Sequence, residues 1–340
     1  MSKNVVIIGG DGIGPEVIAS AVKVLDAVNV PLNMTFARMG LECFRRTGSY
    51  LPDETMTALN GADACLFGAI TSPDASVKDY RSPILHLRKH FDLYANVRPV
   101  VRLAPDLGIG DLNAVIVREN TEGMYTGIEH SNGGMVTLER KVSEKACRRL
   151  IRYAIGHCER EGIRNITCVH KSNVLRLSDG MFKRIFYEEV AGSGLEANDL
   201  LVDAAAAALI MKPQQFGCLV TLNLYGDILS DEAAAIVGGL GFAPSVNHGD
   251  GFDIFEPTHG SAPDIAGKGI ANPTAAILSS AMMLKSMGMK DEAERIGNAV
   301  IATLRKGIRT PDAGGRSTTG DFTQAVTAEL AGASTVKWVV

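Results

Sequence analysis

Two aspartates four residues apart, Asp227 and Asp231, are the first candidates for chemistry in this sequence. They follow the apolar run 217–222, which predicts a buried strand that Gly226 turns into a helix ending near Val237. A spacing of four residues places both carboxylates on one helix face, and paired oxygen ligands suit a hard cation such as Mg²⁺ or Mn²⁺. From this pair alone, the simpler interpretation is two acids that complement a helix dipole.

Three arginines form a second candidate group. Arg88 lies near the end of a helix predicted for residues 80–91, Arg98 directly precedes a strand-ending proline, and Arg118 ends a strand predicted for residues 114–117. A single arginine at such a place is usually solvated or salt-bridged. Three of them beside loops rich in Gly, Asn and Thr suggest a clamp for carboxylates, because a guanidinium grips a carboxylate through two parallel hydrogen bonds.

Two further ionisable residues follow predicted strands. Lys171 comes after the apolar strand 165–169, where a lowered pKa could make it a base; a lone lysine more often extends its amine to water. Asp203 precedes an alanine-rich helix that runs to Lys212, and helix N-capping is its ordinary interpretation. The residues alone leave both alternatives open.

The predicted elements that must position these side chains alternate between strand and helix. The strand 4–8, a glycine-rich turn and the helix 15–28 form one βα unit, although the turn matches the G-x-G-x-x-G dinucleotide pattern poorly. Residues 135–142 predict an exposed strand. The segment 254–273 is long, glycine-rich and irregular, which is typical of functional loops. Further segments are predicted as a buried strand at 62–67, a strand at 93–99, a short strand at 200–202, a flexible loop at 238–244, and helices at 143–161 with Ser143 as N-cap, 179–190, 274–287, 290–305 and 322–330.

Composition favours an ordinary α/β enzyme. The 340 residues include 46% hydrophobic and 6% aromatic residues and 36 glycines, and the net charge of −4 gives no bias towards nucleic acid or anionic membranes. The six cysteines lack metal-ligand spacing and predict buried thiols. Without a leader or an apolar run of membrane-spanning length, the expected location is the cytoplasm.

Taken together, these pieces resemble the β-decarboxylating dehydrogenases, the family of isocitrate, isopropylmalate, homoisocitrate and tartrate/D-malate dehydrogenases. The resemblance covers nearly the whole chain. It is carried by Gly10-Asp-Gly-Ile-Gly-Pro15, Leu87-Arg88 with Tyr94-Ala-Asn-Val-Arg98-Pro, Arg118-Glu-Asn-Thr-Glu-Gly, Tyr225-Gly-Asp-Ile-Leu-Ser-Asp231, His259-Gly-Ser-Ala-Pro-Asp264 and Thr310-Pro-Asp-Ala-Gly-Gly315.

The resemblance implies an α/β, isopropylmalate dehydrogenase-like fold of two domains that share one mixed sheet, unlike a Rossmann fold. Residues 1–99 and 239–340 would form the large, cofactor-side domain, and residues 100–238 the small domain. The implied assembly is a homodimer or homotetramer with active sites shared between subunits. The exposed strand 135–142 would belong to the intersubunit clasp.

Residue roles also follow from the resemblance. Lys171 would act as base at the C2 hydroxyl of a substituted malate, and Tyr125 would deliver a proton after CO₂ leaves. Lys171 and Asp203 would come from the neighbouring subunit. The malate carboxylates would be held by Arg88, Arg98 and Arg118, and Mg²⁺ or Mn²⁺ by Asp203, Asp227 and Asp231.

The same comparison implies NAD as cofactor. Asp264 matches the position where NAD-using relatives hydrogen-bond the adenosine ribose, and NADP-using relatives tend to carry Lys-Tyr where this chain has Asp264-Ile265. An acidic side chain there would repel a 2′-phosphate. The other residues expected at the cofactor are Asn173, Asn223, Glu256, His259, Gly260, Ser261 and Asn272.

Substrate choice should rest on the stretch ahead of Arg88. Ser82 fits isocitrate enzymes, but Ile84 replaces their Asn, whereas Ile84 and Leu85 suit the isopropyl group of 3-isopropylmalate. Because Ser82, Arg81 and His86 are polar, isocitrate or homoisocitrate is the first expectation, 3-isopropylmalate the alternative, and tartrate or D-malate less favoured. A non-catalytic subunit of the same fold should have lost catalytic residues, which this chain retains.

Overall fold

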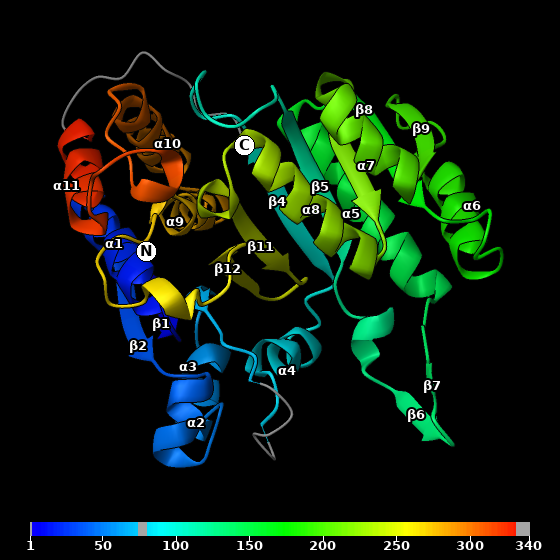
Figure 1. Cartoon of the computed structure of the whole chain (residues 1–340), viewed down its shortest axis with the longest axis horizontal. Coiled ribbons are helices and arrows are strands. Elements are labelled where there is room, and N and C mark those ends of the chain that lie inside the picture. Colours follow the sequence, from blue (N-terminus) through cyan, green and yellow to red (C-terminus); the bar gives the residue numbers. More distant parts are fainter. Residues whose placement is uncertain (1, 74–79, 331–340) are drawn as a thin grey trace.

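A ten-stranded mixed sheet runs through the chain in the computed structural model, which describes residues 2–73 and 80–330 (Figure 1). Its strands lie in the order β2-β1-β3-β12-β11-β4-β5-β10-β8-β9. The pairs on either side of β11 and the pair β4–β5 are antiparallel, and the other pairs are parallel. This mixed order confirms the predicted mixed sheet and differs from a Rossmann sheet. The strands are β1 Lys3–Gly10, β2 Leu32–Ala37, β3 Ala64–Ala69, β4 Ala95–Val101, β5 Asn113–Glu119, β8 Asn165–His170, β9 Glu196–Leu201, β10 Cys218–Thr221, β11 Pro244–His248 and β12 Asp253–Pro257.

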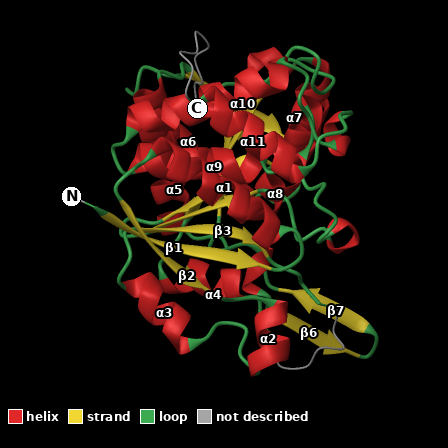
Figure 2. Ribbon diagram, turned by 90° about the vertical axis from the view of Figure 1, so that its left-hand side faces the viewer, coloured by secondary structure: helices red, strands yellow, loops and turns green. Residues whose placement is uncertain are grey.

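Helices cover both faces of this sheet (Figure 2). Among the residues the structure describes, no helix is long and apolar enough to cross a membrane. The predicted N-cap at Ser143 is confirmed, because its side chain accepts a hydrogen bond from the backbone N–H of Ala146. The helices are α1 Gly14–Val28, α2 Leu41–Thr47, α3 Asp53–Asn60, α4 Pro83–His90, α5 Glu144–Glu161, α6 Ser178–Val190, α7 Val202–Met211, α8 Asn223–Val237, α9 Thr274–Ser286, α10 Lys290–Arg305 and α11 Thr319–Glu329.

The two faces of the sheet are packed differently, and this difference places the candidate site. Alternate residues of a strand point to opposite faces; in β1, Val5 and Ile7 join one large core cluster, while Val6 and Ile8 join a smaller one. The large cluster spans both halves of the sheet on one face. The opposite face carries two separate clusters, one over β1, β3 and β12 and one over β5, β10 and α8. Between those two clusters, β11 and β4 carry the buried polar side chains of Ser245, Asn247, Asn96 and Arg98.

Several predicted boundaries change. Gly226 does not turn a strand into a helix: α8 already begins at Asn223, so Gly226 and Asp227 lie inside it. The predicted flexible loop 238–244 contains a short 3₁₀ helix and reaches β11, and the irregular segment 254–273 begins as the buried strand β12. The strand predicted for 135–142 is β7 Met135–Leu138, which pairs antiparallel with β6 Glu129–Asn132 and ends earlier than expected because only residues up to Leu138 have partners in β6.

Candidate active site

Arg118 is the most buried of the three arginines, with 1% of its surface exposed. It is the penultimate residue of β5, which continues to Glu119. Its guanidinium donates to Asp227, and two of its nitrogens donate to Asn223 Oδ1 at 3.1 and 2.8 Å. A Cβ on Gly226 would stand 2.6 Å from the Arg118 side chain. Glycine at that position therefore lets α8 lie directly against the arginine.

Arg98 links the two aspartates of α8, Asp227 and Asp231. It lies in the middle of β4, not at the end of an element as predicted, because the strand continues past the following proline to Val101. Its guanidinium contacts Asp227 and Asp231, each at 3.3 Å, and donates to Ser230 Oγ at 2.6 Å. The spacing of four residues on α8 thus turns both carboxylates towards one buried guanidinium.

Arg88 approaches the same region from α4 and from the other half of the sheet. Its Nε donates to Asn247 Oδ1 at 3.2 Å, and its guanidinium lies 3.8 Å from Glu256. Asn247 also accepts from Asn96 at 3.3 Å and from Asn120 at 2.9 Å. This network of buried amides holds the Arg88 side chain in place. Asn247 and Asn96 lie on β11 and β4, between the two apolar clusters, and sequence reasoning did not select them.

Burial and charge act together on these groups. Burial, and after it the positive charge of the neighbouring Arg118, lower the pKa of Arg88 to about 10. Burial would raise the pKa of Asp227, but Arg118 and Arg98 outweigh it and hold that pKa below its usual value. The pKa of Asp231 is raised, mainly by burial. Three crowded guanidinium groups favour the binding of a multiply charged anion, because each positive charge disfavours the charged form of its neighbours.

Tyr125 completes this cluster. Its hydroxyl donates to Asp227, and the Arg118 guanidinium lies over its ring, 5.0 Å from the centroid. Burial, followed by the hydrogen bond to Asp227, raises the pKa of Tyr125. The phenol therefore keeps its proton at neutral pH, as a general acid must before it donates.

Lys171 and Asp203 form a separate pair. Lys171 follows β8, Asp203 lies inside the first turn of α7 rather than at its N-cap, and the two side chains are hydrogen-bonded to each other. This bond lowers the pKa of Asp203, whose side chain is 63% exposed. Within the part of the chain that the structure describes, no three His, Cys, Asp or Glu residues are grouped to hold a metal ion. A single chain therefore does not bring Asp203 to Asp227 and Asp231.

The loop after β12 is held against the first βα turn. Ile13 N–H donates to the Ser261 carbonyl at 2.8 Å, and Thr71 Oγ1 donates to Ser261 Oγ at 2.7 Å. Gly12 fits this approach because a Cβ there would stand 2.0 Å from that carbonyl oxygen. Ala262 adopts a left-handed backbone with φ 37°, a conformation that costs energy and often marks functional loops. The glycine-rich turn therefore serves as a support for this loop.

His259, in that loop, keeps one unused polar atom. Its Nε2 is buried without a hydrogen-bond partner, and Nδ1 lies 2.9 Å from the Gly260 carbonyl. Burial lowers the pKa of His259, so the ring is neutral at pH 7. A buried polar atom without a partner is costly and points to a ligand that would satisfy it. Asp264 follows on the exposed side of the loop, and Asn272 donates to Asp312 at 3.0 Å.

The remaining predicted residues fall at separate places. Asn173 is exposed near Lys171, and Asn223 and Glu256 belong to the arginine cluster. Ser82 precedes α4 without capping it, and Ile84 packs against the core cluster of β1 and β3. Leu85 lies three residues before Arg88, which places it on the same side of α4.

Comparison with known proteins identifies the relatives of this site. Residues 4–326 match the family model described as isocitrate/isopropylmalate dehydrogenase. The chain belongs to this family. Its relatives include an isocitrate/homoisocitrate dehydrogenase of Thermus thermophilus, 47% identical over 97% of this chain and 99% of that protein. A 3-isopropylmalate dehydrogenase of Methanothermobacter thermautotrophicus is 45% identical over the same shares of the two chains.

A solved structure of isocitrate dehydrogenase from Methylococcus capsulatus matches the fold with a TM-score of 0.93, at 39% identity, over 97% of this chain and all of that one. The protein is therefore a dehydrogenase, in a family of decarboxylating enzymes that use NAD(P) and a divalent metal. Two groups in the chain fit those partners. Asp227 and Asp231 offer hard oxygen donors on one helix face, and His259 Nε2 offers an unsatisfied donor or acceptor beside a strained loop.

Proposed function

We propose that this protein catalyses the NAD- and divalent-metal-dependent oxidative decarboxylation of a 3-substituted (R)-malate, with isocitrate or homoisocitrate as substrate. The observation that carries the proposal is the convergence of Arg88, Arg98 and Arg118 beside Asp227 and Asp231. Three buried guanidinium groups suit a substrate with several carboxylates. The carboxylates of Asp227 and Asp231 suit a divalent cation that the substrate would also coordinate.

The roles of the chain's own residues follow from this arrangement. The arginines would orient the substrate through its carboxylates, Lys171 would take the proton of the C2 hydroxyl, and Tyr125 would give a proton to C3 after the β-carboxylate leaves as CO₂. Asp227, Asp231 and Asp203 would hold the divalent cation, which would supply a Lewis acid beside the C2 oxygen, and bound NAD would supply the hydride acceptor. The low pKa of Asp227 keeps this ligand ionised.

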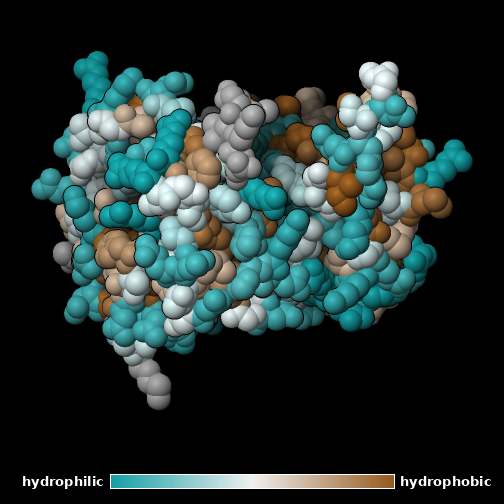
Figure 3. All heavy atoms as spheres, turned by 90° about the horizontal axis from the view of Figure 1, so that it is seen from below, coloured by the Kyte–Doolittle hydropathy of each residue, from teal (hydrophilic) through white to brown (hydrophobic). Residues whose placement is uncertain are grey.

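We propose that Lys171, Asp203 and Asn173 act in the site of a second copy of the chain. Within one chain Asp203 is not grouped with Asp227 and Asp231, and its side chain, paired with Lys171, is largely exposed. Of the twelve exposed large hydrophobic residues in the described chain, eleven fall within residues 100–238. Figure 3 shows hydrophobic patches that are larger on the right-hand side of the molecule. Grouped apolar exposure of this kind favours burial between subunits, which supports a homodimer or homotetramer.

The strand order supports the proposed division into two domains, residues 1–99 with 239–340 and residues 100–238. Strands β5, β10, β8 and β9 form one side of the sheet and come only from the second segment. The candidate site lies where the two segments meet, at β4 and β5. Movement of one domain against the other would then open or close the site.

NAD is proposed over NADP because of Asp264. Its side chain is exposed on the loop that carries His259, and a carboxylate suits a ribose hydroxyl but repels a phosphate. His259, Gly260, Ser261, Ile265 and Asn272 would line the same cofactor.

Substrate selection is proposed to rest on Leu85 and Ser82 more than on Ile84. Ile84 packs into a core cluster, whereas Leu85 shares a side of α4 with Arg88. Ser82 and the nearby polar residues Arg81 and His86 support a third carboxylate. Leu85 supports the second candidate, 3-isopropylmalate, because an apolar side chain suits an isopropyl group.

A kinetic panel tests the proposal. Purified protein is assayed with isocitrate, homoisocitrate, 3-isopropylmalate and D-malate, with NAD and Mn²⁺, and in parallel with EDTA. We expect the highest kcat/KM with isocitrate or homoisocitrate, and loss of activity in EDTA. A preference for 3-isopropylmalate would establish the second candidate, and a preference for D-malate would overturn both.

A further inference from the structure

One fully buried carboxylate, that of Asp179, lies outside the site described above. It stands in the first turn of α6, and none of its surface is exposed. Its Oδ2 accepts from the backbone N–H of Lys171 at 2.7 Å and from the Tyr225 hydroxyl at 3.0 Å. Its Oδ1 accepts from Arg140 at 2.6 Å and from the Ser178 hydroxyl at 3.2 Å. A buried carboxylate is tolerated only when it is paired in this way.

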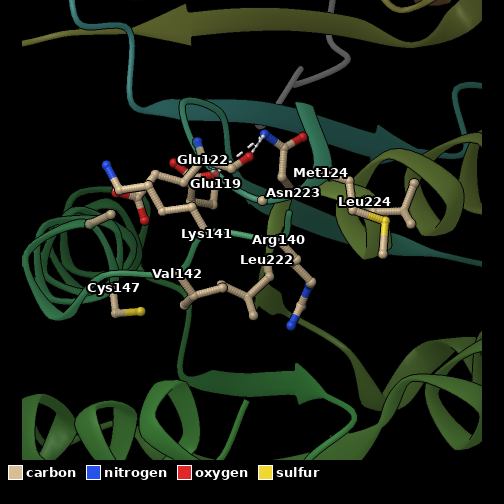
Figure 4. A pocket seen from close by; sticks show the side chains of 12 residues that line it. Glu119, Glu122, Met124, Arg140, Lys141, Val142, Cys147, Leu222, Asn223 and Leu224 are labelled. Atoms are coloured by element: carbon tan, nitrogen blue, oxygen red, sulfur yellow. Dashed lines mark hydrogen bonds and ion pairs between the residues drawn. The ribbon is translucent and has the colours of Figure 1, made fainter. Parts of the chain in front are cut away.

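Three of the four donors to Asp179 come from other parts of the chain, and these parts have different tasks. Lys171 is the proposed base at the end of β8, and Tyr225 lies in α8, two residues before Asp227. Arg140 follows β7, at the base of the β6–β7 arm (residues 129–138). Its guanidinium lies over the Tyr225 ring, 5.5 Å from the centroid. Arg140 and Leu222, which precedes α8, line the same small pocket (Figure 4).

The backbone around Lys171 has little freedom. The N–H of Lys171 is held by Asp179, and the next N–H, of Ser172, donates to His170 Nδ1 at 3.1 Å. His170 is itself fixed by Asp199, at 2.9 Å from Nε2. Two successive peptide groups are thus anchored to buried side chains. A change at either anchor would move the Cα from which the lysine extends.

We propose that Asp179 is a positioning residue that ties the placement of Lys171 to the β6–β7 arm through Arg140. Met135 and Val136 leave apolar surface exposed on that arm, which suits a contact with a second copy in the proposed oligomer. Docking of the arm would hold Arg140, Arg140 would hold Asp179, and Asp179 would fix the peptide of Lys171. Assembly and placement of the base would thereby depend on one buried carboxylate. The inference rests on the proposed role of Lys171 as base.

Asparagine at this position cannot replace the carboxylate. Asp179 presents two acceptor oxygens to two sets of donors, whereas an Asn side chain has one oxygen and one NH₂ group. That NH₂ group would face either the Lys171 N–H or the Arg140 guanidinium, and both are donors. Asp179→Asn should therefore free one end of the link while keeping the size of the side chain.

A double-mutant cycle tests the proposal on the assembled protein. Asp179→Asn is made in the native chain and in Lys171→Ala, whose activity is restored with added methylamine. In the native background we expect kcat to fall about 100-fold, the cost of a displacement of about 1 Å at a reacting group, with an unchanged KM. In the Lys171→Ala background the amine-dependent rate should not change, because no tethered lysine remains to be positioned.

Controls separate positioning from damage to the fold. Glu189→Gln removes another carboxylate from α6 that binds two arginines, Arg148 and Arg152, and should leave kcat unchanged. If Asp179→Asn does not fold, Arg140→Gln takes its place in the cycle with the same expectation. Equal losses of rate in both backgrounds would overturn the proposal. Full kcat in Lys171→Ala alone would instead overturn the base role of that lysine.

Discussion

Gly226→Ala tests the packing that sets the carboxylate site. A new Cβ would stand 2.6 Å from both Cβ and Cγ of Arg118. Carbon atoms normally meet at about 3.5–4.0 Å, so the overlap is about 1 Å. The substitution favours the helix by about 1 kcal/mol, but overpacking in a filled core costs about 1–3 kcal/mol. We expect the clash to outweigh the gain, so the free energy of unfolding should fall by up to about 2 kcal/mol.

The larger effect should be on substrate binding. Relief of the clash must move α8 or the Arg118 side chain, and hydrogen bonds to charged groups contribute about 1.5–3 kcal/mol each. Loss of one such bond to a substrate carboxylate corresponds to a rise in KM of about 10- to 100-fold. The assays are urea unfolding and steady-state kinetics with the preferred substrate.

A matched glycine provides the control. Gly156 lies inside α5, where a Cβ would meet only the mobile end of the Arg160 side chain, at 3.3 Å. Gly156→Ala should keep or raise stability and leave KM unchanged. If Gly226→Ala raised stability and kept the native KM, the close contact between α8 and Arg118 would not matter for the site, and the reasoning would be refuted.

Three other predictions concern single side chains. Tyr125→Phe should lower kcat about 10²- to 10⁴-fold with little change in KM, because a general acid is lost; a native kcat would contradict that role. Asp264→Lys should shift the ratio of kcat/KM for NAD and NADP towards NADP, and an unchanged ratio would place the cofactor's ribose elsewhere. Burial raises the pKa of Asp199, but Lys183, Tyr187 and His170 together lower it to about 2. A carboxylate whose pKa is lowered by folding stabilises the fold at pH values above its unfolded pKa of about 4. The difference in unfolding free energy between the native protein and Asp199→Asn should therefore be largest at neutral pH and shrink between about pH 4 and pH 2. A difference in urea unfolding that does not change with pH would exclude this linkage.

Elements with a strong apolar period were predictable from the sequence. The helix bounds 290–305 agree with α10, and the 15–28 helix agrees with α1 within one residue. The apolar residues of their buried faces recur at helical spacing, and this pattern can be read from the sequence alone. The strand β2 carried no comparable signal, because it is an edge strand with partly exposed residues.

The candidate site was predictable only in part. Charged residues at motif positions, such as Arg118 and Asp231, could be selected from the sequence. Asn247 could not, because the polar residues around it are typical of a loop. Only the structure shows that they form the buried strand β11, between β12 and β4. Asp179 was missed for a similar reason: its partners come from positions 140, 171 and 225, and only the folded chain brings them together.

The most direct test of the proposed chemistry measures NADH and CO₂ together. Purified protein is incubated with isocitrate or homoisocitrate, NAD and Mn²⁺, and both products are quantified before and after EDTA is added. We predict equal amounts of NADH and CO₂, and that EDTA stops the formation of both. NADH formed without CO₂, or formation of both products that continues in EDTA, would contradict a metal-dependent decarboxylating dehydrogenase.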